Sequence, residues 1–199
     1  MKSAKRFFLN GEMQELLARL RQKARSGHLT DKFDHALVIY AWATGCRASE
    51  IASVSLDPKQ PNWIDLKSGL VTITDAKWDS KGTIPLDAAS LRVIRRYVRE
   101  VRPQIRNATV LHHLFLTKTG SPYNPNKMTK KLSMLLRRLG MDGKTAHSFR
   151  HFFCTDLFKR GAQLHEAKAL MRHRDVRSTM VYSHATVDDL RAVVNRRLT

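Results

Sequence analysis

The residues best suited to chemistry lie in the last third of the chain: His147, Arg150 and His151, then His173, and nine residues later Tyr182. Imidazole and guanidinium groups can donate hydrogen bonds to the oxygens of a phosphorus transition state, and a phenol can attack as an oxygen nucleophile. The nearby carboxylates do not form a metal-ligand pattern. The spacing therefore predicts attack on a phosphodiester by Tyr182, without a metal ion.

Each of these residues also has a plainer interpretation. Tyr182 alone is typical of an amphipathic core or surface tyrosine, and a free phenol, with a pKa of about 10, reacts only beside cations or a base. His147 and Arg150, three residues apart on one expected helix, are predicted to face a shared cleft, but taken alone they could form a buried helix face with a satisfied histidine. A buried guanidinium needs anionic partners, and this segment offers only Asp156. A phosphate from outside the chain would serve instead.

A zinc site is the second alternative. His147 and His151 have the i, i+4 spacing with which helices chelate zinc. Arg150 lies between them, and its fixed charge opposes a metal ion. Cys154 could add a third ligand, but no fourth is apparent. We therefore expect no metal and no other cofactor.

The charge of the chain indicates its partner. The sequence has 36 Lys and Arg against 17 Asp and Glu, a formal net charge of +19. Such an excess attracts polyanions, so nucleic acid is the expected ligand. A solvated basic surface, or a ribosomal-type protein, is the alternative on charge alone.

Length and composition set the class of protein. The 199 residues suffice for one well-packed domain, and a hydrophobic content of 42% excludes a disordered chain. Cys46 and Cys154 form no Cys-x-x-Cys pair, which favours a reducing compartment and argues against a disulfide scaffold. Neither a signal peptide nor a bilayer-spanning stretch is apparent. We expect a cytoplasmic protein without membrane contact, associated with the nucleoid if bacterial.

The chemistry-bearing residues must be positioned mainly by helices. Apolar residues recur at helical spacing in several segments, and glycines or an Asn-Pro pair mark their ends. Short extended runs with a polar connection predict a small antiparallel sheet in the middle. The expected helices cover 12–25, 31–44, a region around 91–101, 125–139, 145–160, 164–172 and 187–197, and the expected strands cover 63–66, 70–74 and 82–86. No repeat or linker divides the chain, so residues 1–199 are expected to form one domain.

Several segments resemble motifs of the tyrosine recombinases, also called the phage integrase family. Residues 44–51 read Thr-Gly-Cys-Arg-Ala-Ser-Glu-Ile, similar to the family's Thr-Gly-x-Arg-x-Ser-Glu-Leu/Ile segment. This likeness implies that Arg47 is the first catalytic arginine and that Glu50 supports the site. Residues 77–86 resemble the pattern Lys-x-x-x-Lys-x-x-Val/Ile-Pro-Leu, whose first lysine is catalytic. That points to Lys77, with Lys81 as the second choice.

The C-terminal third extends the resemblance. His147-x-x-Arg150-His151 is similar to the family's His-x-x-Arg-His box, His173 to the histidine of its Leu-Gly-His element, and Tyr182-Ser183-His184 to its Tyr-x-His. The glycine usual before the second histidine is Arg172 here, which either alters the local turn or adds a phosphate contact. The resemblance runs from about residue 8 to the C-terminus.

The resemblance implies a mainly α-helical, tyrosine-recombinase catalytic-domain fold and a site-specific recombinase that integrates, excises or inverts DNA. Tyr182 would form a 3′-phosphotyrosine, Arg47 and Arg150 would hold the phosphate oxygens, and Lys77 would protonate the leaving 5′-oxygen. His147 would act as general base and His173 as a phosphate hydrogen-bond donor. No cofactor is implied.

The implied partners are double-stranded DNA, three further copies of the chain in a homotetramer on paired sites, and an accessory DNA-bending protein. The helix at 187–197 is the expected element of exchange between neighbours. We expect no N-terminal DNA-clamping domain, as in a short recombinase of the size of the fimbrial phase-variation invertases or in a catalytic fragment. A catalytically silent DNA-binding protein and a type IB topoisomerase-like relaxing enzyme remain as rival interpretations.

Overall fold

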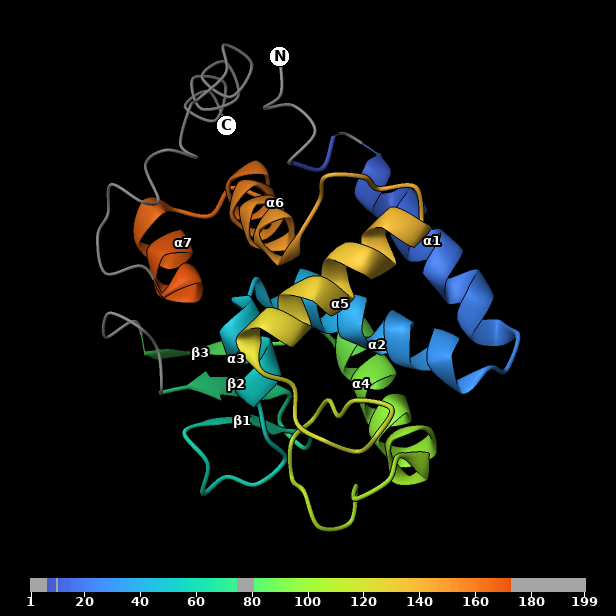
Figure 1. The fold of residues 1–199 in the computed structure, drawn as a ribbon. Helices are drawn as coiled ribbons and strands as arrows, with labels where there is room; N and C mark the ends of the chain where they lie inside the picture. The colour runs from blue at the N-terminus through green and yellow to red at the C-terminus, as the bar shows by residue number, and fades with distance from the viewer. Residues whose placement is uncertain (1–6, 10, 75–80, 173–199) are drawn as a thin grey trace, which may run out of the picture.

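The structure is a computed structural model that describes residues 7–9, 11–74 and 81–172 (Figure 1). Helices dominate it, and one small sheet lies near the middle of the chain, so the expected mainly α-helical architecture with an antiparallel sheet is confirmed. The helices are α1 (Glu12–Arg25), α2 (Leu29–Thr44), α3 (Ala48–Ser53), α4 (Ala88–Glu100), α5 (Pro125–Arg138), α6 (Ala146–Lys159) and α7 (Leu164–Met171), with a 3-10 turn η3 (Arg102–Gln104) after α4.

The sheet consists of β1 (Asn62–Asp65), β2 (Leu70–Ile73) and β3 (Gly82–Pro85), paired antiparallel in the order β1-β2-β3. Ile64 pairs with Val71, and Val71 pairs with Ile84, so three buried aliphatic side chains form a row across the strands. Such cross-strand rows fix the register of a sheet that buries one face. The three strands lie within one residue of their predicted positions.

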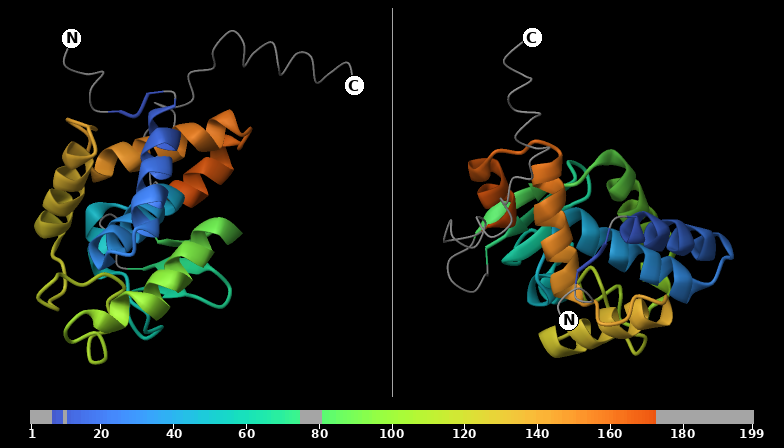
Figure 2. Two further views of the ribbon diagram at one scale, coloured as in Figure 1. Left: turned by 90° about the vertical axis from the view of Figure 1, so that its right-hand side faces the viewer. Right: turned by 90° about the horizontal axis from the view of Figure 1, so that it is seen from above.

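Helix α2 is the central element of the fold. Its side chains are buried along most of its length, and it packs against α1, α4 and α6. Helices on several sides of one apolar helix form the core around it, and Figure 2 shows this arrangement from two further directions. Gly45 ends α2 in the left-handed conformation, with φ of 57°. This turn leads directly into α3, where the first predicted site residues lie.

Local signals set the starts of two helices. The Asp87 carboxylate accepts hydrogen bonds from the backbone N–H groups of Ala89 and Ser90, and the Asn124 side chain accepts one from the N–H of Lys127. Side-chain oxygens at these positions satisfy N–H groups that have no partner within the helix. Asn124 followed by Pro125 was predicted to open a helix, and this is confirmed.

Two buried charges of the fold were not foreseen. Asp34 is fully buried on α2 and forms ion pairs with Lys131 and Arg138 of α5. Arg102 donates hydrogen bonds to the carbonyl oxygens of Ala108 and His113 in the loop after η3. Asp34 joins two helices whose paired residues are 97 and 104 positions apart, whereas Arg102 holds the loop that follows it within 11 residues. Apolar periodicity reveals neither contact.

Helix α7 lies between α6 and the edge strand β3, and packs against both (Figures 1 and 2). The end of α7 is therefore brought close to the turn after α2. The helix predicted for 187–197 lies outside the described residues. Among the helices of the described part, none is long and apolar enough to cross a bilayer.

Candidate active site

Arg47 lies at the start of α3 and is held by Glu50 from the same helix. Its backbone N–H donates to Oε2 of Glu50 over 2.7 Å, and its Nη1 donates to Oε1 over 2.8 Å. The acidic residue three positions after the arginine thus binds both its backbone and its side chain. Glu50 is nearly inaccessible, whereas the Arg47 side chain is 34% exposed. The guanidinium is therefore held by Glu50 and remains partly accessible to solvent.

Arg150 lies on α6 and is almost completely buried. Its Nη1 donates to the carbonyl oxygen of Gly45 over 2.9 Å, and its Nη2 donates to the carbonyl oxygen of Met171. Asp156, the one carboxylate that this segment of the sequence offers, pairs with Arg160 at the exposed end of α6. Backbone carbonyls at the ends of α2 and α7 satisfy the buried guanidinium instead.

The predicted clustering of His147 and Arg150 is confirmed. Arg47, His147 and Arg150 line one open hollow of about 220 Å³, together with Thr129 of α5 and Thr145, the N-cap residue of α6. Three segments far apart in the sequence meet there. The hollow combines two guanidinium groups with an imidazole, the donor set that a phosphate group would need.

The electrostatics of the hollow favour an anion. Burial, and then the charges of Arg150 and Arg47, lower the pKa of His147, so its imidazole is predominantly neutral at neutral pH and can accept a proton. Burial, and then the charge of Arg47, lowers the pKa of Arg150 to about 10. Arg150 therefore keeps its charge at neutral pH.

Glu50 is the common partner of two arginines. Its Oε2 also accepts a hydrogen bond from Nη2 of Arg172 over 2.7 Å, and both side chains are buried. Burial by itself raises the pKa of Glu50, but Arg172, the Arg47 backbone N–H and the charges of Arg150 and Arg47 outweigh it and lower the pKa. The carboxylate is therefore ionised in the folded protein.

Arg172 keeps the left-handed turn that a glycine would form, with φ of 52°. Its side chain reaches inward to Glu50, which does not support the alternative in which Arg172 adds a phosphate contact. Sequence reasoning missed this interaction. The one signal was an arginine at a position where glycine is usual.

His151, the last residue of the predicted box, lies outside the hollow. Its ring stacks on Phe7 with centroids 3.7 Å apart. Within residues 7–9, 11–74 and 81–172, no group of three His, Cys, Asp or Glu side chains is arranged to hold a metal ion. Lys77, His173 and Tyr182 lie outside the described residues, although Lys81 and Arg172, next to those segments in sequence, are described.

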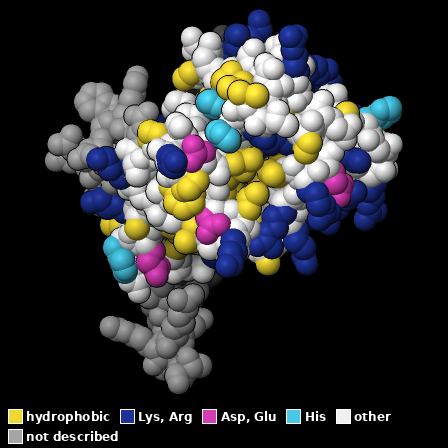
Figure 3. Space-filling model, turned by 90° about the horizontal axis from the view of Figure 1, so that it is seen from below, with side chains coloured by type: hydrophobic (Ala, Val, Ile, Leu, Met, Phe, Trp, Pro, Cys, Tyr) yellow, Lys and Arg dark blue, Asp and Glu magenta, His cyan; other side chains and the backbone are white. Residues whose placement is uncertain are grey.

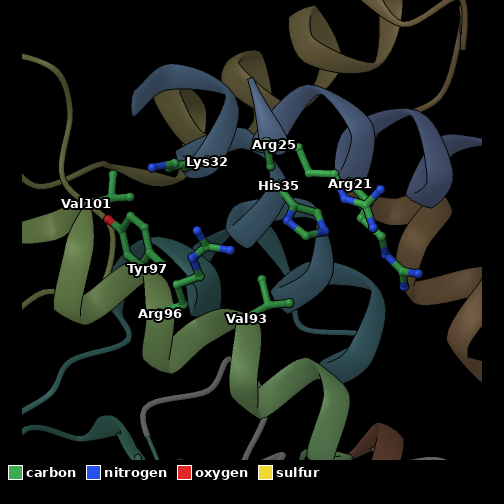
Figure 4. A pocket seen from close by; sticks show the side chains of 9 residues that line it. Arg21, Arg25, Lys32, His35, Val93, Arg96, Tyr97 and Val101 are labelled. Carbon is green, nitrogen blue, oxygen red and sulfur yellow. The ribbon is translucent and has the colours of Figure 1, made fainter. Parts of the chain in front are cut away.

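Two other hollows contain none of the predicted site residues. One, of about 270 Å³ between α1, α2 and α4, is lined by basic and apolar side chains (Figure 4), among them Arg21, His35 and Arg96. The other, of about 400 Å³, is mainly apolar and includes Phe33 and Tyr123. Hydrophobic side chains also gather between Lys and Arg on the face seen in Figure 3.

Comparison with known proteins agrees with the geometry. The profile of the phage integrase family matches residues 6–188. The tyrosine recombinase XerD of Staphylococcus saprophyticus is 26% identical over 185 residues, which cover 92% of this chain and 60% of that protein. XerD of Staphylococcus aureus is 27% identical over 168 residues, which cover 82% of this chain and 54% of that protein. The chain thus spans between about half and three fifths of these relatives.

Solved structures share the fold. XerA recombinase superposes with a TM-score of 0.73 at 19% identity, covering 96% of this chain and 64% of the other. An integrase of the Tn1549 transposon, solved in complex with a circular-intermediate DNA, gives a TM-score of 0.74 at 19% identity, covering 96% and 66%. XerH site-specific recombinase bound to its difH substrate gives 0.68 at 20% identity, covering 94% and 53%. At these identities the likeness concerns the fold alone.

Proposed function

The chain belongs to the phage integrase family of tyrosine recombinases, and on this premise we propose that it is the catalytic domain of a site-specific DNA recombinase. The observation that carries the proposal is the hollow in which Arg47, His147 and Arg150 meet. This donor set suits a phosphodiester, and the net charge of +19 suits a polyanionic substrate.

The proposed reaction conserves the phosphodiester bond energy. The Tyr182 oxygen attacks the scissile phosphorus, the bond from phosphorus to the 5′-oxygen breaks, and a 3′-phosphotyrosine forms. His147 accepts the phenolic proton, and Lys77 donates a proton to the leaving 5′-oxygen. A 5′-hydroxyl from a partner strand then attacks the phosphotyrosine, which releases Tyr182 and closes the new strand.

Arg47 and Arg150 are proposed to bind the non-bridging oxygens as charge develops on them. Two of the five N–H groups of the Arg150 guanidinium donate to carbonyls of the described residues, and we propose that others donate to the phosphate. Preorganised donors of this kind stabilise a transition state most where water is excluded. His173 would add a further hydrogen bond.

The proposed partners follow from the same chemistry. Exchange between two duplexes needs four active sites, so we propose a homotetramer on paired DNA sites, with an accessory DNA-bending protein as a further partner. We also propose that residues 1–199 act as one catalytic domain. The segment 187–197 is the proposed contact between neighbouring copies.

The decisive experiment is trapping of the covalent intermediate. A half-site duplex with a nick close to the cleavage point loses its short 5′-hydroxyl strand by diffusion, so the phosphotyrosine accumulates. We expect a DNA adduct that resists denaturation and disappears on protease treatment. Tyr182→Phe should form no adduct and should bind the same duplex with nearly unchanged affinity. An adduct at the wild-type level in Tyr182→Phe would refute the nucleophile assignment.

Two further arms separate the rival activities. Cleavage should proceed in excess EDTA, and its complete loss, restored by magnesium or zinc, would indicate a nuclease instead. Strand exchange between two paired sites should exceed relaxation of a supercoiled plasmid. Relaxation by a monomer without exchange would indicate a type IB topoisomerase-like enzyme.

A further inference from the structure

The end of α7 places a buried arginine where the backbone is strained. Arg172 has a left-handed backbone, a conformation that side-chain-bearing residues rarely adopt. Its side chain is fully buried, and its Nε has no hydrogen-bond partner in the part of the chain that the structure describes. Burying a charge and leaving a donor unsatisfied both destabilise a fold. Other interactions of Arg172 must therefore offset these two costs.

The main interaction of Arg172 is with Glu50. The carboxylate oxygen Oε2 accepts from Arg172, and Oε1 accepts from Nη1 of Arg47. Glu50 is thus held from both sides, and its orientation decides where the Arg47 guanidinium lies. Without Arg172, one oxygen would lose its strongest donor in a site from which water is nearly excluded.

The residue before Arg172 is hydrogen-bonded to Arg150, which lines the hollow together with Arg47. Arg150 donates to the carbonyl oxygen of Met171, so consecutive residues at the end of α7 bind Glu50 and Arg150. The aliphatic part of Arg172 also packs against Gly82, where an added Cβ would lie 3.1 Å from Cγ of Arg172. Arg172 therefore contacts α3 and β3, and it is followed in sequence by His173.

We propose that Arg172 is a positioning residue, which acts through Glu50 to orient Arg47 for phosphate binding. The inference rests on the proposed function. Arg172 is not placed to touch the substrate, because its side chain is buried and does not line the hollow. Its effect on the reaction is transmitted by one carboxylate, and this distinguishes it from an arginine that only stabilises the fold.

The first test is the pH dependence of single-turnover cleavage at saturating protein. We expect Arg172→Gln to slow cleavage at least tenfold at pH 7, with half-site affinity within twofold of wild type. Arg172→Lys, which keeps the charge, should retain at least a third of the rate. Arg160→Gln, an exposed arginine paired with Asp156 on α6, is the matched control and should leave the rate unchanged.

The acid limb of the pH–rate profile reports the groups whose protonation stops cleavage, which on the proposed mechanism include Glu50 and the base His147. The ionisable groups that face Glu50 are Tyr40, Cys46, Arg47, Arg150 and Arg172. Loss of the Arg172 charge raises the pKa of the buried carboxylate, so Glu50 becomes protonated at higher pH. As the pH is lowered, the cleavage rate of Arg172→Gln should therefore begin to fall at a higher pH than the rate of the wild type. A purely structural role would slow the reaction without this displacement.

A double-mutant cycle tests whether Arg172 acts through Glu50, with cleavage rates compared among variants that fold as the wild type does. Because Arg172 acts through Glu50, adding Arg172→Gln to Glu50→Gln should slow cleavage less than twofold further. A tenfold additional loss, or wild-type rate and pH profile in Arg172→Gln, would overturn the inference. Absence of any adduct in the wild type would instead refute the proposed function, so the two failures are distinguishable.

Discussion

At the scale of single residues, the site is a cluster of charged side chains, most of which are buried. Arg47, Arg150 and Arg172 surround Glu50, and all three act on its pKa. One carboxylate cannot neutralise three guanidinium groups, so the cluster keeps a positive excess beside the hollow. Removing one partner from such a cluster leaves another charge unsatisfied. We therefore expect substitution of a buried member, Arg150 or Arg172, to affect both the phosphate site and the packing around it.

The first prediction concerns Arg47. Its side chain is partly exposed, so Arg47→Ala should remove a phosphate donor with little loss of packing. Loss of one preorganised donor typically costs about 3–4 kcal/mol of transition-state stabilisation, so single-turnover cleavage should slow at least about a hundredfold. Arg160→Ala serves as the control. A rate within a fewfold of wild type would show that Arg47 has no part in catalysis.

The sequence indicated that His147 and Arg150 lie at one site, but it did not indicate which groups bind Arg150. The spacing of His147 and Arg150 on one helix placed both at a common hollow, as the structure confirms. The partners of Arg150 were missed, because its acceptors are backbone carbonyls 105 and 21 residues away in the sequence. Every residue carries such a carbonyl, so no side-chain pattern marks it.

At the scale of elements, helix ends were predictable wherever a side chain or a glycine marks them. The bounds of α1 agree with the prediction, since apolar spacing and Gly27 define them. Helix α2 begins at Leu29, two residues before the predicted start, because its cap residue His28 gives no side-chain signal. The η3 turn was missed, since three residues are too few for a periodic pattern.

The second prediction concerns the glycine that ends α2. Gly45→Ala would place a methyl group 2.6 Å from Cδ1 of Phe153 and strain a left-handed backbone. Gly27→Ala is the matched control, because Gly27 is also left-handed but has open space around it. Overpacking typically costs about 1–3 kcal/mol, so Gly45→Ala should lose that much more stability in urea denaturation. It should also slow cleavage, because Gly45 carries an acceptor of Arg150.

Equal losses in the two glycine variants would contradict this prediction. They would show that Phe153 moves aside without cost, and that the backbone conformation alone limits both positions.

The third prediction concerns His35, which lines the basic hollow between α1, α2 and α4 (Figure 4). Burial, and then the charges of Arg21 and Arg96, lower its pKa to about 4. Its neutral form is therefore favoured by folding. This stability is complete above an unfolded pKa of about 6.5 and is lost as the pH falls towards the folded pKa.

Because solvent reaches part of the ring, the energetic effect is smaller than the full pKa shift would give. We expect the protonation of His35 to lower the free energy of unfolding by about 1 kcal/mol between pH 7 and pH 5. The measurement is urea denaturation of the wild type and His35→Gln at both pH values. The wild type should lose about that much more stability than the variant, whereas His165→Gln, at an exposed position on α7, should behave as the wild type. An identical pH response in all three would refute the assignment.

At the scale of the whole molecule, charge and fold have different consequences. The fold brings distant segments to one hollow, while the net charge of +19 acts over the entire surface. Counterion release makes such binding strongly dependent on salt and tolerant of sequence. Charge alone therefore predicts affinity for DNA, and on the proposed function the hollow determines where a phosphate would react.

The last prediction separates these two contributions. If the chain neutralises about six phosphates of a half-site, log K should fall with log salt at a slope of roughly −5, at about −0.9 per contact. Lys130 is exposed on α5 next to Thr129, which lines the hollow. Lys130→Ala should therefore weaken binding and reduce the slope by about one. Arg99→Ala is the control, because Arg99 lies on α4, away from that hollow, and pairs with Glu100. Gel-shift titrations of the three proteins at several salt concentrations provide the slopes. Tight, salt-independent binding of one copy would show that the chain binds DNA mainly through contacts other than phosphate neutralisation. Equal slopes for Lys130→Ala and the wild type would show that the DNA does not lie along α5.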